Sequence, residues 1–196
     1  DWIMTAHHAD DQLETLLMRL NRGAGVSGLA GIRARQGHVL RPLLGARRAQ
    51  LLAYAGHHDL PYVDDPSNSD PRFDRAAIRR HLAGVDWLDP LAAVRSAGAL
   101  DEVTEALDWT VDALEASHVR CEGGAWVLDR TDLPRELLRR LLLRMLARLD
   151  PEAPPPRGEA VDRAMDAAGR GQQISIGQAL LIGGRSWTVK AAPPRR

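Results

Sequence analysis

A short apolar run, WIMTAH at residues 2–7, leads directly into a cluster of polar residues and then into a leucine-rich pattern. The run is too short for a helix and predicts the end of a buried strand. Residues 9–21 then show the spacing of one buried helix face, which is carried by Leu13, Leu16, Leu17 and Leu20. A strand, a polar turn and a helix in this order form the βα unit of an α/β sheet, so we expect such a sheet here.

Polar side chains fill the turn between this strand and helix: His7, His8, Asp10 and Asp11. Ligands of α/β sheets bind beyond the carboxyl ends of the strands, so a site is expected at this turn. On a helix Asp11 and Glu14 share one face. Such a pair can hold a cationic amine, accept its proton or carry Mg²⁺. The alternative is that these residues cap the helix start and line a solvated face.

The same segment also resembles a generic metal-binding cluster, because imidazole and carboxylate ligands suit Zn, Mn or Fe. On this alternative the chain is a metal-dependent hydrolase built on His7, His8, Asp10 and Asp11. The other histidines offer no obvious complement to the cluster. The pair at residues 57–58 lies on a predicted amphipathic helix and is expected at the surface.

Arginines dominate the basic residues of the later segments. Arg41 follows an apolar run and stands at another predicted strand end, although a lone surface arginine would look the same. Arg75 and Arg79 are four residues apart and could grip a phosphate together. Ion pairs with Asp70 and Asp74 are the alternative.

The charge balance of the whole chain gives no sign of a polyanion-binding protein, because 26 basic residues offset 26 acidic ones. All the basic residues except Lys190 are arginines, which suit bidentate phosphate contacts. A GC-rich genome would produce the same bias. On a predicted helix over residues 135–149, Arg140, Arg144 and Arg148 form a stripe that is either a solvated face or an RNA contact.

A single cysteine, Cys121, rules out an intrachain disulfide and fits a reducing compartment. No apolar run approaches the roughly 20 residues of a membrane span, and no secretory signal is visible. We therefore expect a cytoplasmic protein without a membrane association.

The remaining pattern divides the chain near residues 84–90, where loop-rich sequence gives way to helical sequence. The predicted domains are residues 1–84, 85–150 and 151–196. The predicted elements after residue 22 are a glycine-rich loop at 23–32, a short strand before Pro42, helices at 46–60, from residue 75, and at 91–117, 135–149 and 159–168, a brief strand from residue 125, and two or three strands in the tail.

Three segments occur in order with characteristic gaps: TAHHADDQLETLLMRLNRGAGVSGLAGI, RPLL, and LPYVDDPSNSDPRFDRAAIRRHL. Together they resemble the bacterial tRNA(Ile)-lysidine synthetases. The match is close over residues 1–82 and looser from there to the end. The ordered set is highly specific, although each motif alone is not.

The resemblance implies an α/β fold. A Rossmann-like, ATP-pyrophosphatase-type nucleotide-binding domain with a partial parallel sheet would precede a mainly helical domain and a small C-terminal β element. It implies an AMP-forming carbon–nitrogen ligase that joins free lysine to the wobble cytidine of the tRNA(Ile) anticodon. ATP and Mg²⁺ are the implied cofactors, and tRNA(Ile) and free lysine are the implied partners. A homodimer is left open.

The resemblance also assigns residues. The implied catalytic group is Asp11, Glu14 and Arg41. The implied substrate- and tRNA-binding group is His8, Asp65, Asn68, Arg75 and Arg79. The chemistry suits such groups, because a lysine ammonium with a pKa of about 10.4 must lose a proton before it can attack.

One part of the family pattern has no counterpart in this sequence, namely the SGGxDS-like loop that grips phosphate through backbone N–H groups. Because the chain also begins abruptly with strand-like residues, we expect it to be truncated at the N-terminus and inactive alone. A non-catalytic RNA-binding fragment is therefore a further alternative.

Overall fold

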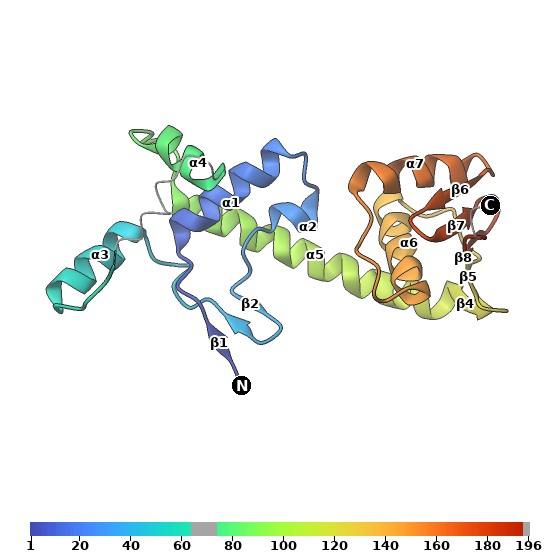
Figure 1. Ribbon diagram of the computed structural model, residues 1–196, viewed down its shortest axis with the longest axis horizontal. Helices are drawn as coiled ribbons and strands as arrows, with labels where there is room; N and C mark the ends of the chain where they lie inside the picture. The colour runs from blue at the N-terminus through green and yellow to red at the C-terminus, as the bar shows by residue number, and fades with distance from the viewer. Residues whose placement is uncertain (64–73, 194–196) are drawn as a thin grey trace. The chain divides into compact units, whose positions relative to one another are not determined.

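The computed structural model describes residues 1–63 and 74–193 (Figure 1). These residues form two compact units, each of which makes most of its contacts within itself. The first unit is Asp1–Ala106 and the second is Leu107–Arg196, so the division falls within one long helix, α5 (Pro90–His118). The domain limits predicted at residues 84 and 150 stay predictions.

The first unit combines a small sheet with several helices. Its further elements are β1 (Ile3–Met4), α1 (Ala9–Asn21), α2 (Val26–Leu29), β2 (Arg35–Gln36), β3 (Val39–Leu40), α3 (Arg48–His57) and α4 (Asp74–Leu82). Strand β1 pairs in parallel with β3, and β2 pairs with β3 in the antiparallel sense. The fold is therefore mixed α/β, with one parallel strand pair of the kind that the sequence predicts.

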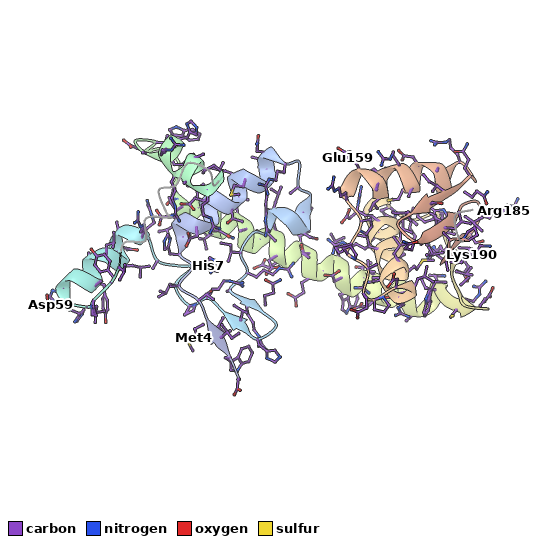
Figure 2. The ribbon with its side chains drawn as sticks, viewed as in Figure 1. Met4, His7, Asp59, Glu159, Arg185 and Lys190 are labelled. Atoms are coloured by element: carbon purple, nitrogen blue, oxygen red, sulfur yellow. The ribbon has the colours of Figure 1, made fainter. Side chains whose placement is uncertain are left out.

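Three local predictions for this unit are wrong in part. Strand β1 is exposed rather than buried, because it lies at the sheet edge; Met4 marks its position in Figure 2. The glycine-rich segment 23–32 is not all loop, since it contains the short helix α2. Helix α3 forms at the predicted place but buries none of its residues, so its apolar side chains have no core to join in the described chain.

Helix α1 spans the predicted residues, yet its buried face differs from the predicted leucine stripe. Leu13 is buried, whereas Leu20 is exposed. The buried residues lie in the first half of the helix, and most of them are polar: Ala9, Asp11, Gln12, Leu13, Glu14 and Thr15. Buried polar side chains need hydrogen-bond partners inside the protein. The first half of α1 is therefore the candidate position of a functional site.

The second unit is built on a five-stranded antiparallel sheet in the order β4-β5-β8-β7-β6. Its elements are β4 (Val119–Glu122), β5 (Ala125–Leu128), α6 (Arg135–Leu149), α7 (Gly158–Gly169), β6 (Gln173–Ile176), β7 (Ala179–Ile182) and β8 (Trp187–Ala191). Helices α6 and α7 pack against the sheet around a core that includes Leu141, Met145 and Trp187 (Figure 1). The brief strand predicted from residue 125 thus belongs to the same sheet as the tail strands, because β5 pairs directly with β8.

The arginine stripe of α6 faces acidic residues of α5. Arg140 Nη1 lies 2.9 Å from Asp108 Oδ1, and Arg148 Nη2 lies 2.8 Å from Glu115 Oε1. Arg144 Nη1 lies 2.9 Å from Glu115 Oε2 and also bonds Asp112. The stripe is more than a solvated face, although the Arg148 side chain is 47% exposed, and the RNA contact that the sequence left open stays a prediction. It is a row of ion pairs that joins two helices.

No helix among the described residues has both the length and the apolar character needed to cross a bilayer.

Glu115 should be the most sensitive member of this row, because it is 8% exposed and serves two arginines. We expect Glu115→Ala to lower the free energy of unfolding by about 2 kcal/mol, since a charged hydrogen bond from Arg144 and an ion pair with Arg148 are lost. Denaturant titration measures the change. Glu105→Ala, at an exposed position of the same helix, is the matched control. Equal effects of the two substitutions would contradict the ion-pair interpretation.

Candidate functional site

The start of α1 is fixed by reciprocal hydrogen bonds between His8 and Asp11. The backbone N–H of Asp11 donates to His8 Nδ1 at 3.4 Å, and the backbone N–H of His8 donates to Asp11 Oδ2 at 3.0 Å. This is a capping box, which satisfies two N–H groups that a helix start leaves without helical partners. The capping role that the sequence left open is therefore confirmed for His8 and Asp11.

Two arginines of α4 reach across to the carboxylates of α1. Arg79 Nε donates to Glu14 Oε1 at 2.6 Å, and Arg79 Nη2 donates to Asp11 Oδ1 at 3.1 Å. Arg75 Nε lies 3.5 Å from Glu14 Oε2, and its Nη2 donates to Thr15 Oγ1 at 3.4 Å. We call Asp11, Glu14, Arg75 and Arg79 the acid–arginine cluster. Five of the predicted site residues, these four and His8, are brought together here.

Both carboxylates of the acid–arginine cluster are buried, with Asp11 7% and Glu14 4% exposed. Glu14 Oε2 has no hydrogen bond to any described residue, because the Arg75 contact is an ion pair without hydrogen-bond geometry. A buried carboxylate oxygen without a donor is costly. It is therefore the atom of the cluster that an incoming donor group would satisfy.

Burial and pairing act in opposite directions on Glu14. Burial raises the pKa of Glu14 above its usual range, although the hydrogen bond and charge of Arg79 work against this rise. The pKa of Arg79 is also raised, chiefly by its hydrogen bond to Glu14. Desolvation dominates at Glu14 because its side chain is 5% exposed, whereas the Arg79 side chain is 25% exposed. The result is a carboxylate that holds a proton more readily than a surface one.

No hydrogen bond or ion pair among the described residues joins Arg41 to this cluster, although the charges of Arg41, Asp11 and Arg75 all act on the pKa of His7. Arg41 follows β3, and its Nη1 donates to the Arg33 carbonyl at 2.8 Å. It lines a cavity of about 620 Å³ together with Gln12 and residues of α5, but Asp11 and Glu14 are not among the lining residues. The structure therefore does not join Arg41 to the carboxylates in one pocket. Asp65 and Asn68 lie outside the described residues.

The residues proposed for a metal centre have other partners. His7 Nδ1 hydrogen-bonds Thr5 Oγ1 at 2.9 Å, and burial lowers the pKa of His7 (its place just before α1 is labelled in Figure 2). Asp10 Oδ2 accepts from the backbone N–H of Arg48 at 2.7 Å. Within the residues that the structure describes, no group of three or more His, Cys, Asp or Glu side chains is arranged to hold a metal. The geometry gives the hydrolase alternative no support.

Gln12 is a buried polar residue that sequence reasoning missed. Its amide contacts the backbone of residues 30–32. The signal was present, because a glutamine must find hydrogen-bond partners when it is buried. Its partners come from a segment about 20 residues away, which periodicity cannot identify.

Comparison with known proteins relates the chain to enzymes of RNA modification. Residues 1–85 match the PP-loop domain family. A tRNA(Ile)-lysidine synthase of Zymomonas mobilis is 36% identical over 99% of this chain and 61% of its own length. Enzymes of the same name from Novosphingobium aromaticivorans and Pseudomonas aeruginosa are 46% and 42% identical over 78% and 71% of the chain. The alignments to the latter two cover 49% and 34% of those proteins. The chain thus spans less than two thirds of each of these relatives.

The raised pKa of Glu14 predicts how stability depends on pH. Below about pH 4.3, the ordinary pKa of glutamate, the carboxyl is protonated in both the folded and the unfolded state. As pH rises through the raised folded pKa, the unfolded state has already lost this proton, so the free energy of unfolding falls. Relative to Glu14→Gln, the wild type should therefore lose stability as the pH rises from about 4.3 through the raised folded pKa of Glu14.

Urea titrations of both proteins across this range measure the difference. Glu152→Gln, an exposed change, should leave the pH profile as in the wild type. If the wild type instead gains stability relative to Glu14→Gln as the pH rises, pairing with the arginines outweighs burial at Glu14, and the direction we assign to the pKa of Glu14 is wrong.

Proposed function

The chain belongs to the tRNA(Ile)-lysidine synthase family, and on this premise we propose that it carries out part of lysidine formation. In this reaction free lysine is joined to the wobble cytidine of the tRNA(Ile) anticodon, and ATP activates the cytidine by adenylylation. The match of residues 1–85 to the PP-loop domain supports the use of ATP. The proposed substrates are tRNA(Ile), free lysine and ATP. Cytoplasmic location and a homodimer stay predictions.

The acid–arginine cluster is the observation that carries this proposal. The lysine amine is a nucleophile only after its ammonium loses a proton, and a buried carboxylate with a raised pKa is suited to accept one. Glu14 Oε2 lacks a hydrogen-bond donor among the described residues, so an incoming amine would supply the missing bond. We assign the orientation of the amine to Asp11 and Glu14, and proton acceptance to Glu14.

Proton and bond changes balance with these roles. The amine nitrogen forms a bond to the activated cytidine carbon, the bond from this carbon to the adenylyl oxygen breaks, and AMP leaves. The nitrogen gives up a proton to Glu14. Arg79 bonds both carboxylates and so holds them in place. Its positive charge also reduces the repulsion between the two negative charges.

The arginines of α4 are the proposed contacts to RNA phosphate near this site. The Arg75 side chain is 43% exposed and makes only long contacts to α1, so it can turn toward a phosphate. We keep Asp65 and Asn68, which lie outside the described residues, and His8 as further proposed substrate contacts.

Neither ATP phosphates nor Mg²⁺ are assigned to residues here. The carboxylates that could hold Mg²⁺, Asp11 and Glu14, are both paired with Arg79, which disfavours a cation between them. The SGGxDS-like phosphate pattern is absent from this sequence. ATP supplies the leaving group of the reaction, whereas orientation of the amine and acceptance of its proton are assigned to residues of this chain.

Isosteric changes in the acid–arginine cluster test the proposal. In the full-length gene product, incorporation of labelled lysine into a tRNA(Ile) transcript should fall at least about 100-fold in Asp11→Asn and in Glu14→Gln, because positioned acid–base groups contribute factors of this size. Glu152→Gln, at an exposed position of the second unit, is the control and should retain wild-type rates. Variants that keep most of the activity while binding tRNA normally would sink the assignment. A wild type that forms no lysidine at all would overturn the proposed function itself.

A further inference from the structure

Gln12 is held by both ends of its side-chain amide. It is 2% exposed on α1, its Oε1 accepts from the backbone N–H of Ile32 at 2.7 Å, and its Nε2 donates to the Ala30 carbonyl at 3.4 Å. The residue between them, Gly31, has φ 67, and a Cβ at that position would lie 2.7 Å from Gln12 Oε1. The turn therefore rests directly on the glutamine, and only glycine fits at its centre.

A second residue of the same helix holds the beginning of this turn. Arg19, about two helical turns after Gln12, donates from Nη1 to the Gly28 carbonyl at 2.6 Å and to the Gly31 carbonyl at 3.0 Å. The side chains of Gln12 and Arg19 thus bind four backbone groups between residues 28 and 32. The turn has little freedom to shift along the helix while both contacts are present.

The chain that leaves this turn determines where Arg41 lies. The backbone N–H of Arg41 donates to the Ala34 carbonyl at 2.8 Å, and its Nη1 donates to the Arg33 carbonyl at 2.8 Å. Both acceptors are within two residues of Ile32, which Gln12 holds. Any displacement of the turn would therefore be passed on to the Arg41 guanidinium.

Arg41 has a hydrogen-bond donor that the described residues do not use. Its Nε is buried and has no hydrogen-bond partner among them. Arg41 and Gln12 both line the cavity of about 620 Å³. A buried N–H of a cation without an acceptor is unfavourable, so an acceptor from a bound molecule is the simplest way to satisfy it.

We propose that Gln12 is a positioning residue, which holds the turn at residues 30–33 so that Arg41 can donate its Nε–H to an anionic oxygen of a substrate in this cavity. The proposal rests on the proposed function for the identity of the substrates. The shared ligand chemistry is an oxygen anion, either the carboxylate of free lysine or a phosphate of ATP or tRNA. Gln12 itself does not touch the reacting atoms.

Glutamine suits this role because it must accept and donate at once. A glutamate side chain at this position would keep the acceptor for Ile32 but could not donate to Ala30 when ionised, so Gln12→Glu tests one half of the clamp. Gln12→Met keeps the length of the side chain and removes both bonds. Gln36→Met, at an exposed glutamine, is the matched control.

The first experiment needs no activity. NMR measures hydrogen exchange at the Ile32 amide and at the Arg41 Nε–H in the purified protein. The Ile32 amide should exchange at least about fivefold faster in Gln12→Met, the factor expected for one lost hydrogen bond. The Arg41 Nε–H should also exchange faster, because a displaced turn exposes it to water, and neither group should change in Gln36→Met. Faster exchange at the Ile32 amide with unchanged exchange at the Arg41 Nε–H would show that Gln12 holds the turn but does not position Arg41. The proposal would then be wrong. If Gln12→Met does not fold, Gln12→Glu replaces it, which removes only the bond to Ala30: faster exchange at the Arg41 Nε–H then supports the proposal, and unchanged exchange there contradicts it.

The second experiment measures lysidine formation by the full-length gene product with Gln12→Met, Arg41→Gln and the double variant. If Gln12 acts through Arg41, the two losses will not add, and the double variant will resemble Arg41→Gln. A rise in KM for lysine indicates the lysine carboxylate as the ligand, whereas a rise in KM for ATP or tRNA indicates a phosphate. Additive losses would overturn the proposal. If the wild type forms no lysidine, but exchange at Ile32 and at Arg41 still rises together in Gln12→Met, the positioning role is retained. The proposed function is then wrong.

Discussion

A carboxylate removed from water must be paired, and this constraint shapes the first unit. Glu14 and Asp11 lie in the buried half of α1, and Arg79 supplies hydrogen bonds to both. Because each charge would be strongly unfavourable alone, the pairing specifies where α4 lies against α1. The structural role and the proposed chemical role thus belong to the same atoms. The site that we propose to handle an amine is also the site that joins two helices.

Helix α1 serves as a polar hub rather than an ordinary amphipathic helix. Successive residues of its first turns face different partners: Asp10 accepts from the start of α3, Asp11 from its own cap and α4, and Gln12 holds the turn after α2. Glu14 faces α4 again. This dense use of polar groups explains why so many titratable residues are crowded together in the sequence. It also brings the acid–arginine cluster and the Arg41 cavity to two sides of one helix.

Sequence patterns predicted elements better than they predicted partners. The limits of α1 and α6 followed from the spacing of apolar residues, since a buried stripe is a local signal. The pairing of β5 with β8 joins residues about 60 apart, so the second sheet could not be recognised from periodicity. The motifs singled out the carboxylates and the arginines of the site. That Arg79 would bond Glu14 and Asp11 depended on the packing of α4 against α1, which no local pattern encodes.

The central claim is that Glu14 and Arg79 depend on one another inside the fold. A double-mutant cycle with Glu14→Gln, Arg79→Met and both together measures this directly through the free energy of unfolding. Our account predicts a coupling of about 2 kcal/mol, in the range found for groups that share a charged hydrogen bond. Losses that add to within about 0.5 kcal/mol would show that the two side chains act independently and would contradict the account.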